Sequence, residues 1–214
     1  VCRKLLTIAG KRRAKPHSEF RLSAKIVKAG RIERAEEFIA TDDFDRWMTR
    51  GLPLCGDVVL TTEAPLGEVG QIKKLPVALA QRVVTLRGKP GLLDNTYLLY
   101  ALQTEPLRSR LIGRATGTTV VGIKQSELRK VTVALPPIET QRNISRVLAS
   151  LDDRIDHNCV LATNLEAIAR QLFKSWFVDF DPVRAKAAGE KPPGLANDIA
   201  ALFPDRFVES ESGD

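Results

Sequence analysis

The sequence predicts an α+β fold, in which a mixed domain is followed by one long helix of the coiled-coil type. Three observations predict it. Short β-branched segments alternate with short helical segments from residue 20 to residue 135, and Pro136-Pro137 then interrupt the chain. From Ile144 onward, apolar residues recur at alternating steps of four and three. The length of 214 residues allows one sizeable domain with an appendage.

The composition excludes several classes of protein. Hydrophobic residues make up 43% of the chain, which is enough to bury a core. The three cysteines, Cys2, Cys55 and Cys159, are scattered and form neither a disulfide framework nor a CxxC metal motif. His17 and His157 lie too far apart to suggest a metal site. We expect no signal peptide and no membrane-spanning run, and therefore a reduced cytoplasmic protein.

The net charge of +7 is distributed unevenly. Residues 1–34 carry a net charge of +9, residues 35–135 carry +2 and residues 136–214 carry −4. A basic start favours a polyanionic partner, because a local positive field steers phosphate groups. The alternative is a disordered basic arm around Lys11-Arg12-Arg13-Ala14-Lys15.

Turn residues and β-branched runs divide the mixed domain. Strands are expected at residues 22–27, 57–62, 68–73, 77–86 and 131–135. Short helices are expected at residues 43–50, 95–103 and 106–114, the last with Thr104 as N-cap and Pro106 in its first turn.

The long helix is expected from about Gln141 to about Val178, roughly 55 Å at 1.5 Å per residue. A domain of this size cannot cover such a helix along its whole length, so much of its apolar seam must pack on another long helix. The polar Asn158 in the seam would fix register and partner number. The alternative is an amphipathic helix folded onto its own domain. The seam consists of Ile144, Leu148, Leu151, Ile155, Asn158, Ala162, Leu165, Ala169, Leu172 and Trp176.

Several motifs carry a resemblance to a known family. Leu135-Pro136-Pro137-Ile138-Glu139-Thr140-Gln141, the run from Leu172 to Phe180 (LFKSWFVDF) and Pro182-Val183-Arg184-Ala185-Lys186 resemble the conserved helical region of type I restriction–modification specificity subunits. Residues 56–62 (GDVVLTT) and 115–120 (ATGTTV) are similar to segments of that family's target recognition domains. The chain departs from the pattern at Thr140, where the family usually has Glu. It also carries one recognition domain and one helix where the family has two of each, so we expect a half-length or truncated subunit.

The resemblance implies four segments: a basic N-terminal remnant (1–20), a target recognition domain (21–138), a spacer and dimerisation helix (139–180) and a linker-like tail (181–214). It implies a non-catalytic subunit that reads part of a split double-stranded DNA site in host defence. Methyltransferase (M) and restriction (R) subunits would dock on it. S-adenosylmethionine, ATP and Mg²⁺ are expected on those partners, and no cofactor or metal on this chain.

Candidate DNA-contacting residues occur in small polar loops beside basic residues. Hydroxyls and backbone N–H groups in a glycine-containing loop can approach phosphates or base edges, and Glu can accept from cytosine. The alternatives are a plain surface turn and a solvated strand end. Arg82 and Gln81 are expected together on the next strand as further candidates. The candidates are Thr61, Thr62, Glu63, Arg82, Arg114, Thr116, Gly117, Thr118, Thr119 and Lys124.

The end of the long helix and its pairing leave alternatives open. Trp176-Phe177 and Phe180 form an aromatic docking patch for a partner or pack against the returning chain. A single seam permits a homodimer with helices in either direction.

Two rival functions remain. Asp57 followed by Gln71-Ile72-Lys73 has the spacing of a Mg²⁺-dependent nuclease, in which carboxylates hold the metal and Lys stabilises the transition state. The other rival is a non-DNA coiled-coil interaction protein, or an inactive truncated fragment.

Overall fold

The computed structural model describes residues 6–7, 19–34, 37–49, 51–117 and 119–208. The chain divides into two compact units, Val1–Leu151 and Asp152–Asp214. The division lies inside the long helix α5 (Ile138–Phe177). The basic cluster at residues 11–15 and Thr118 lie outside the described residues. The four segments expected from the sequence stay a prediction.

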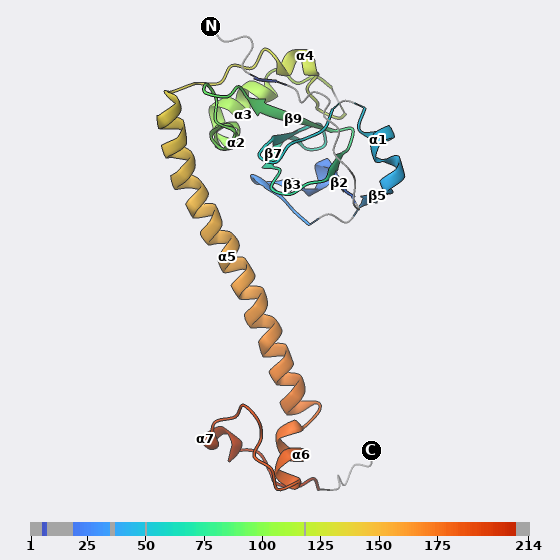
Figure 1. The fold of residues 1–214 in the computed structure, drawn as a ribbon, viewed down its shortest axis with the longest axis vertical. Coiled ribbons are helices and arrows are strands. Elements are labelled where there is room, and N and C mark those ends of the chain that lie inside the picture. Colours follow the sequence, from blue (N-terminus) through green and yellow to red (C-terminus); the bar gives the residue numbers. More distant parts are fainter. Residues whose placement is uncertain (1–5, 8–18, 35–36, 50, 118, 209–214) are drawn as a thin grey trace. The chain divides into compact units, whose positions relative to one another are not determined.

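The centre of the first unit is a four-stranded antiparallel sheet in the order β1-β9-β6-β7. Its strands are β1 (Leu6–Thr7), β6 (Val58–Thr62), β7 (Leu66–Gln71) and β9 (Val83–Gly88). Figure 1 labels β9 and β7. The β-branched run of β6 suits a central strand, and its first four residues are buried. The strand expected at 57–62 is therefore confirmed, and its partner, expected at 68–73, lies two residues earlier, at Leu66–Gln71.

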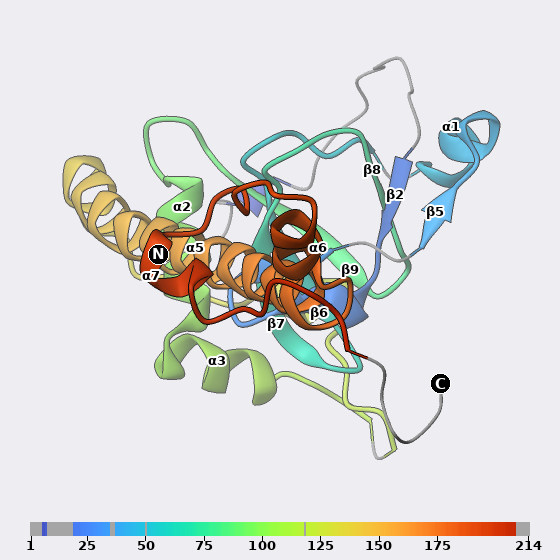
Figure 2. The same cartoon turned by 90° about the horizontal axis from the view of Figure 1, so that it is seen from below.

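A smaller three-stranded sheet has the order β5-β2-β8, with β5 at Phe38–Ile39, β2 at Glu19–Leu22 and β8 at Val77–Leu79. β2 pairs with β8 in parallel. The 3-10 turn η2 (Thr41–Asp43) leads into the short helix α1 (Phe44–Trp47), which lies beside β5 and β2 (Figure 2).

Two of the expected strands are interrupted. The strand predicted at 22–27 is broken after Leu22 by the 3-10 turn η1 (Ala24–Ile26), and β3 (Val27–Lys28) pairs with β4 (Arg31–Ile32). The strand predicted at 77–86 is split at residues 80–82, because β8 belongs to one sheet and β9 to the other.

Three helices cover the first unit's main sheet and loops. α2 (Asn95–Gln103) coincides with the predicted helix, and the Asp94 carboxylate caps it by accepting from the Tyr97 N–H at 2.8 Å. α3 (Glu105–Ile112) begins after Thr104 as predicted, and α4 (Gln125–Leu128) follows a loop. The core beneath them includes Leu60, Val69, Leu86, Leu98, Leu102, Leu107, Leu111, Ile123 and Leu128.

Residues 131–135 form no strand, contrary to expectation. Their apolar alternation reflects the packing of Val131, Val133 and Leu135 against the core. The intervening carbonyls of Thr132 and Ala134 accept hydrogen bonds from side chains, the Arg110 guanidinium at 3.0 Å and the Tyr97 hydroxyl at 3.1 Å. Side chains thus take the place of a neighbouring strand.

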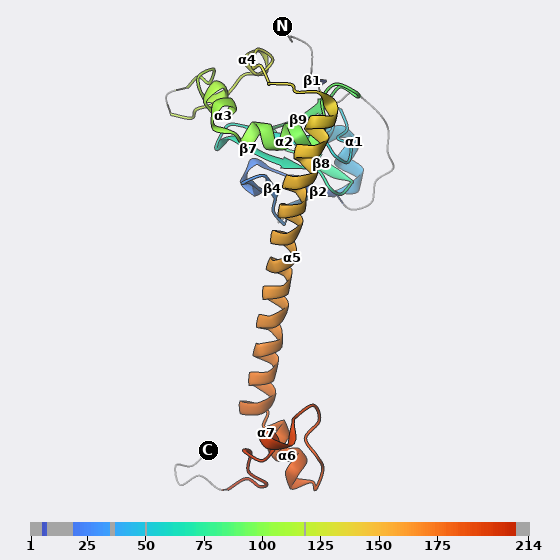
Figure 3. The same ribbon diagram turned by 90° about the vertical axis from the view of Figure 1, so that its left-hand side faces the viewer.

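The 40-residue helix α5 confirms the predicted long helix and the α+β class. In the second unit α5 ends at Phe177, and Phe180, whose φ of 54° is left-handed, precedes the next helix. The tail predicted as linker-like instead contains α6 (Asp181–Ala187) and α7 (Asn197–Ala200), which lie side by side (Figure 3). Lys186 Nζ ties them by donating to the carbonyl of Ala200 at 3.2 Å. Among the described residues, no helix is long and apolar enough to cross a membrane.

Candidate nucleic-acid interface

Three separate segments meet at the end of strand β6. The Thr62 N–H donates to the Arg82 carbonyl, and the Ile123 N–H donates to the Thr62 carbonyl, both at 2.9 Å. Glu63 also pairs with Gly122 in an isolated β-bridge. The fold therefore brings together candidates that lie up to sixty residues apart in the sequence. We call the surface formed by Thr62, Glu63, Gln81, Arg82 and the described residues of the loop, 116–117 and 119–122, the loop face.

The loop at residues 116–122 is closed by its own backbone. Thr116 and Gly122 exchange two hydrogen bonds, of 2.8 and 3.0 Å. Gly117 has φ of +119°, and a Cβ there would lie 2.2 Å from the Val120 carbonyl oxygen, so the turn requires glycine. Thr116, Gly117 and Thr119 are exposed. The loop therefore presents small polar groups on a fixed backbone.

The predicted candidates at the β6–β7 turn differ in their roles. Glu63 and Arg82 form an ion pair, with 2.8 Å between Glu63 Oε1 and Arg82 Nε. The Arg82 side chain remains 55% exposed, so its guanidinium is both oriented and accessible. Thr61, in contrast, is fully buried, and its hydroxyl accepts from the Glu68 N–H at 2.9 Å. Thr61 shapes the turn, and its side chain is absent from the surface.

Arg114 and Lys124 flank the loop as exposed cations. Arg114 pairs with Glu127 at 3.3 Å, and Glu127 also binds Lys130 at 2.5 Å. These contacts lower the pKa of Glu127, chiefly through the hydrogen bond from Lys130. The Lys124 carbonyl starts α4 by accepting from the Leu128 N–H at 2.9 Å.

A cleft of about 450 Å³ opens beside the loop face. Its lining combines apolar side chains with the polar side chains of Thr62, Gln81, Thr85 and Gln125. Gln81 was a candidate from the sequence, whereas Gln125 and Trp47 were missed. Four segments that are distant in the sequence form this cleft, so no local sequence pattern identifies its lining residues. The lining includes Trp47, Met48, Thr62, Gln81, Val83, Ile123 and Gln125.

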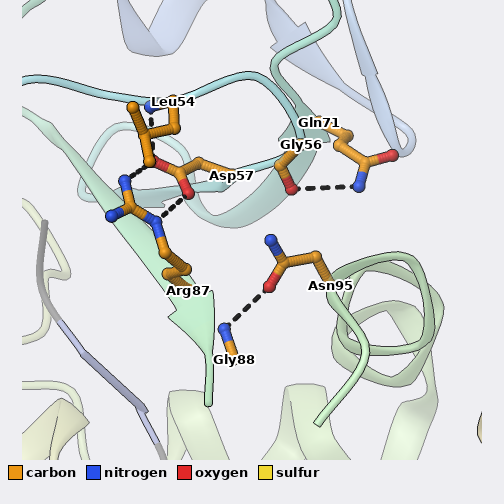
Figure 4. Close-up of polar contacts among 7 residues, drawn as sticks. All are labelled: Leu54, Gly56, Asp57, Gln71, Arg87, Gly88 and Asn95. Carbon is orange, nitrogen blue, oxygen red and sulfur yellow. Dashed lines mark hydrogen bonds and ion pairs between the residues drawn. The ribbon is translucent and has the colours of Figure 1, made fainter. Parts of the chain in front are cut away.

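The nuclease pattern is contradicted by the contacts of Asp57 (Figure 4). Asp57 is 1% exposed, and its carboxylate oxygens accept from Arg87 Nε at 2.5 Å and from a terminal guanidinium nitrogen at 2.6 Å. The Leu54 N–H also donates to it at 2.8 Å. The pair raises the pKa of Arg87, mainly through the hydrogen bond to Asp57. Gln71 is likewise engaged, since its amide donates to the Gly56 carbonyl at 3.0 Å.

These residues therefore hold strands together. Asn95 adds to the same network by accepting from the Gly88 N–H at 2.7 Å, which joins α2 to the end of β9 (Figure 4). Within the described ranges, no group of three or more His, Cys, Asp or Glu is placed to hold a metal ion.

The predicted seam of α5 is largely exposed in the single chain. Leu151, Ile155 and Leu165 are 51%, 49% and 56% exposed. Leu161 and Ile168, one residue from seam positions, are 47% and 54% exposed and widen the apolar face. Leu148 and Trp176 are half-buried. The remaining seam residues are exposed, namely Ile144, Asn158, Ala162, Ala169 and Leu172.

The aromatic residues at the end of α5 divide between the two expected roles. Trp176 packs edge-on against Phe203 with ring centroids 5.7 Å apart, so it contacts the returning chain. Phe177 and Phe180 also contact rings of that chain but remain 54% and 42% exposed.

Known proteins resemble this chain in sequence. Residues 22–166 match the family described as type I restriction modification DNA specificity domain. The type I restriction enzyme MjaIX specificity subunit of Methanocaldococcus jannaschii is 35% identical over 129 residues, which cover 60% of this chain and 29% of that protein. The HindI specificity subunit of Haemophilus influenzae is 42% identical over 78 residues, which cover 36% of this chain and 17% of that protein. The chain thus spans less than a third of the length of these curated relatives.

Solved structures show the same fold. The type I restriction–modification S subunit from M. genitalium matches with a TM-score of 0.53 and 19% identity, over 87% of this chain and 44% of that one. The HsdS subunit from Thermoanaerobacter tengcongensis matches with a TM-score of 0.53 and 15% identity, over 85% of this chain and 45% of that one. Because the family match covers more than half of its residues, the chain belongs to the type I restriction–modification DNA specificity family.

Proposed function

We propose that this chain reads one half of a split double-stranded DNA site and directs partner subunits to it. The observation that carries the proposal is the loop face, where the Glu63–Arg82 pair and the closed loop at 116–122 meet at the end of β6. Family membership supports the same function.

The chemistry of the loop face suits base and phosphate contacts. An oriented guanidinium such as that of Arg82 can bind guanine or phosphate with two hydrogen bonds. Gln81 and Gln125, at the cleft, have the amide groups that pair with adenine in the major groove. Thr116 and Thr119 supply hydroxyls beside exposed backbone. Arg114 and Lys124 would add sequence-independent attraction to phosphates.

The exposed seam supports pairing with a second copy of the chain. In a parallel pair each residue faces its own copy, so that Ala162 meets Ala162 and Ala169 meets Ala169, which leaves gaps. In an antiparallel pair centred between Asn158 and Ala162, Ile155 meets Leu165 and Leu151 meets Ala169. Each alanine then faces a larger side chain, since Ala169 meets Leu151 and Ala162 meets Asn158, and the gaps are filled as close packing requires. We therefore propose an antiparallel homodimer, which would read a symmetric split site.

Catalysis is assigned to the partners in this proposal. Methyltransferase subunits would bring S-adenosylmethionine, and the restriction subunit would bring ATP and Mg²⁺ chemistry, in cytoplasmic host defence. The chain's own part is recognition and spacing. Its basic charge, +7 overall, suits a DNA partner.

The test is selection of DNA from a random duplex pool by the purified chain, followed by binding measurements at several salt concentrations. We expect enrichment of a short half-site, and affinity that falls steeply with salt because phosphate contacts release counterions. Arg82→Ala should weaken binding to the selected sequence by about tenfold or more, the loss of one good base contact. Lys89→Ala is the matched control, since Lys89 follows the opposite end of β9.

Two results would oppose the proposal. If no sequence were enriched from the random duplex pool, the loop face would not recognise a DNA sequence. Binding that is indifferent to salt would favour the non-DNA interaction protein.

A further inference from the structure

Helix α5 joins the recognition domain through a buried glutamine. Gln141 is fully buried although it lies in the second turn of an otherwise amphipathic helix. Its Oε1 accepts from the Asp94 N–H at 3.0 Å, and its Nε2 donates to the carbonyls of Leu92 at 3.0 Å and Pro136 at 2.8 Å. All three partners belong to the segments that enter α2 and α5, so one side chain links both.

A second contact follows one turn later on the same face. Ser145, which is 6% exposed, donates from its hydroxyl to Asp94 Oδ1 at 2.9 Å. The same oxygen accepts the capping hydrogen bond from the Tyr97 N–H. The first turns of α5 are therefore attached to the N-terminus of α2 at two points separated by one turn.

The contacts of Gln141 and Ser145 attach helix α5 to the recognition domain and also restrict the direction of its axis. Hydrogen bonds require particular distances and angles, whereas apolar side chains tolerate sliding and rotation. Two anchor points one turn apart restrict both the tilt of the helix axis and the rotation about it. At 100° per residue, the anchoring stripe lies roughly a quarter-turn from the exposed seam. The anchor therefore leaves the seam uncovered.

We propose that Gln141 is a positioning residue that fixes the direction in which α5 leaves the recognition domain, and thereby the spacing between the two halves of the DNA site. The spacing part rests on the function proposed above. Buried polar networks specify one arrangement where apolar contacts would allow several. In this chain the arrangement specified is the exit angle and rotation of the spacer helix.

The geometric part is tested by spin-label distance measurements on the full chain. One label is attached to the native, exposed Cys55 and the other to Ser150→Cys on α5, in a background of Cys2→Ser and Cys159→Ser. We expect a narrow distance distribution for this reference protein. Gln141→Met keeps the side-chain length but removes every hydrogen bond, so the fraction of molecules with a displaced helix should rise by about tenfold or more.

Thr140→Met is the matched control, because Thr140 is the exposed neighbour on the same turn. It should leave the distribution narrow. Ser145→Ala is a milder variant that keeps Gln141 in place and should broaden the distribution to a smaller extent, which covers the case in which Gln141→Met does not fold. An unchanged width in a folded Gln141→Met protein, or in Ser145→Ala where Gln141→Met fails to fold, would overturn the proposal.

The functional part is tested by co-expression with the cognate methyltransferase subunit and mapping of methylated adenines. Gln141→Met should retain half-site affinity but lose methylation at the reference spacing or spread it over neighbouring spacings. Methylation at the reference spacing and rate, despite a broadened distance distribution, would overturn the link to spacing. Failure of the unsubstituted chain to bind any half-site would instead oppose the proposed function, and the distance measurement would still decide the role of Gln141.

Discussion

Helix α5 buries polar side chains in its first turns and exposes apolar side chains farther along. In the first turns of α5, Gln141 and Ser145 are polar and buried, with exposed fractions of 0% and 6%. Farther along, Leu151 and Leu165 are apolar and about half exposed, at 51% and 56%. The start of α5 is therefore held by specific polar contacts within the chain, whereas its later turns expose apolar side chains, which we propose pack on another helix.

The energetics of the two regions differ accordingly. Burying one Leu or Ile side chain contributes about 1.5–3 kcal/mol, so the exposed seam is a substantial unused source of binding energy. A buried amide contributes little net stability when satisfied but costs about 1–3 kcal/mol for each group left unpaired. The seam therefore favours association, and the anchor favours one geometry.

The largest effect is expected from a charge in the seam. Leu165→Asp places a carboxylate where the proposed partner's Ile155 packs, twice in each symmetric dimer. We expect self-association to weaken by about 100-fold or more, because each charge must be desolvated without a partner. Sedimentation velocity over a range of concentrations measures it. Unchanged self-association, or a chain that is monomeric before substitution, would contradict pairing through this seam.

The next effect concerns the anchor. Asp94→Ala removes the cap of α2 and the acceptor of Ser145, so the recognition domain should lose about 1–3 kcal/mol of unfolding free energy. Urea denaturation followed by circular dichroism measures the loss. Self-association should stay the same, since Asp94 lies in the other unit from the seam's centre. A change in association of similar size would show that the two regions are not independent.

A smaller change is expected from replacing the polar seam residue. Asn158→Leu should tighten self-association by about tenfold while reducing its uniqueness, because a polar seam residue specifies register and partner number at a cost in stability. Light scattering coupled to size exclusion should then show species beyond the dimer. Weaker association in the variant would mean that Asn158 makes a favourable contact across the pair.

The smallest effect is expected on the opposite face of the same helix. Val160 is 59% exposed and lies about half a turn from the seam. Val160→Lys should change both unfolding free energy and association by about 0.5 kcal/mol or less. The same two measurements check it. A large loss of association would place the interface on this face and not on the predicted seam.

The sequence predicts those features that depend on local patterns. The β-branched run of β6 and the heptad repeat of α5 each identify their element, and α2 lies where it was expected. The strand expected at 131–135 is absent because the alternation of Val131, Val133 and Leu135 arises from packing against the core, without pairing to a strand.

The candidate nucleic-acid interface was predictable only in part, because local sequence patterns identify its loop but not its cleft. The loop at 116–122 has a local signature in Gly117, whereas the cleft beside it combines residues such as Trp47 and Gln125 from distant segments. Gln141 belongs to a motif that resembles the family, but its full burial follows from tertiary contacts with Leu92 and Asp94.

The most direct test is a map of methylated adenines in cells that express this chain with its cognate methyltransferase subunit. Two antiparallel copies should direct methylation to a split motif whose halves are palindromic and separated by one fixed spacing. A continuous motif, an asymmetric split motif in the absence of any second specificity chain, or no methylation despite co-purification of the two subunits would contradict the account.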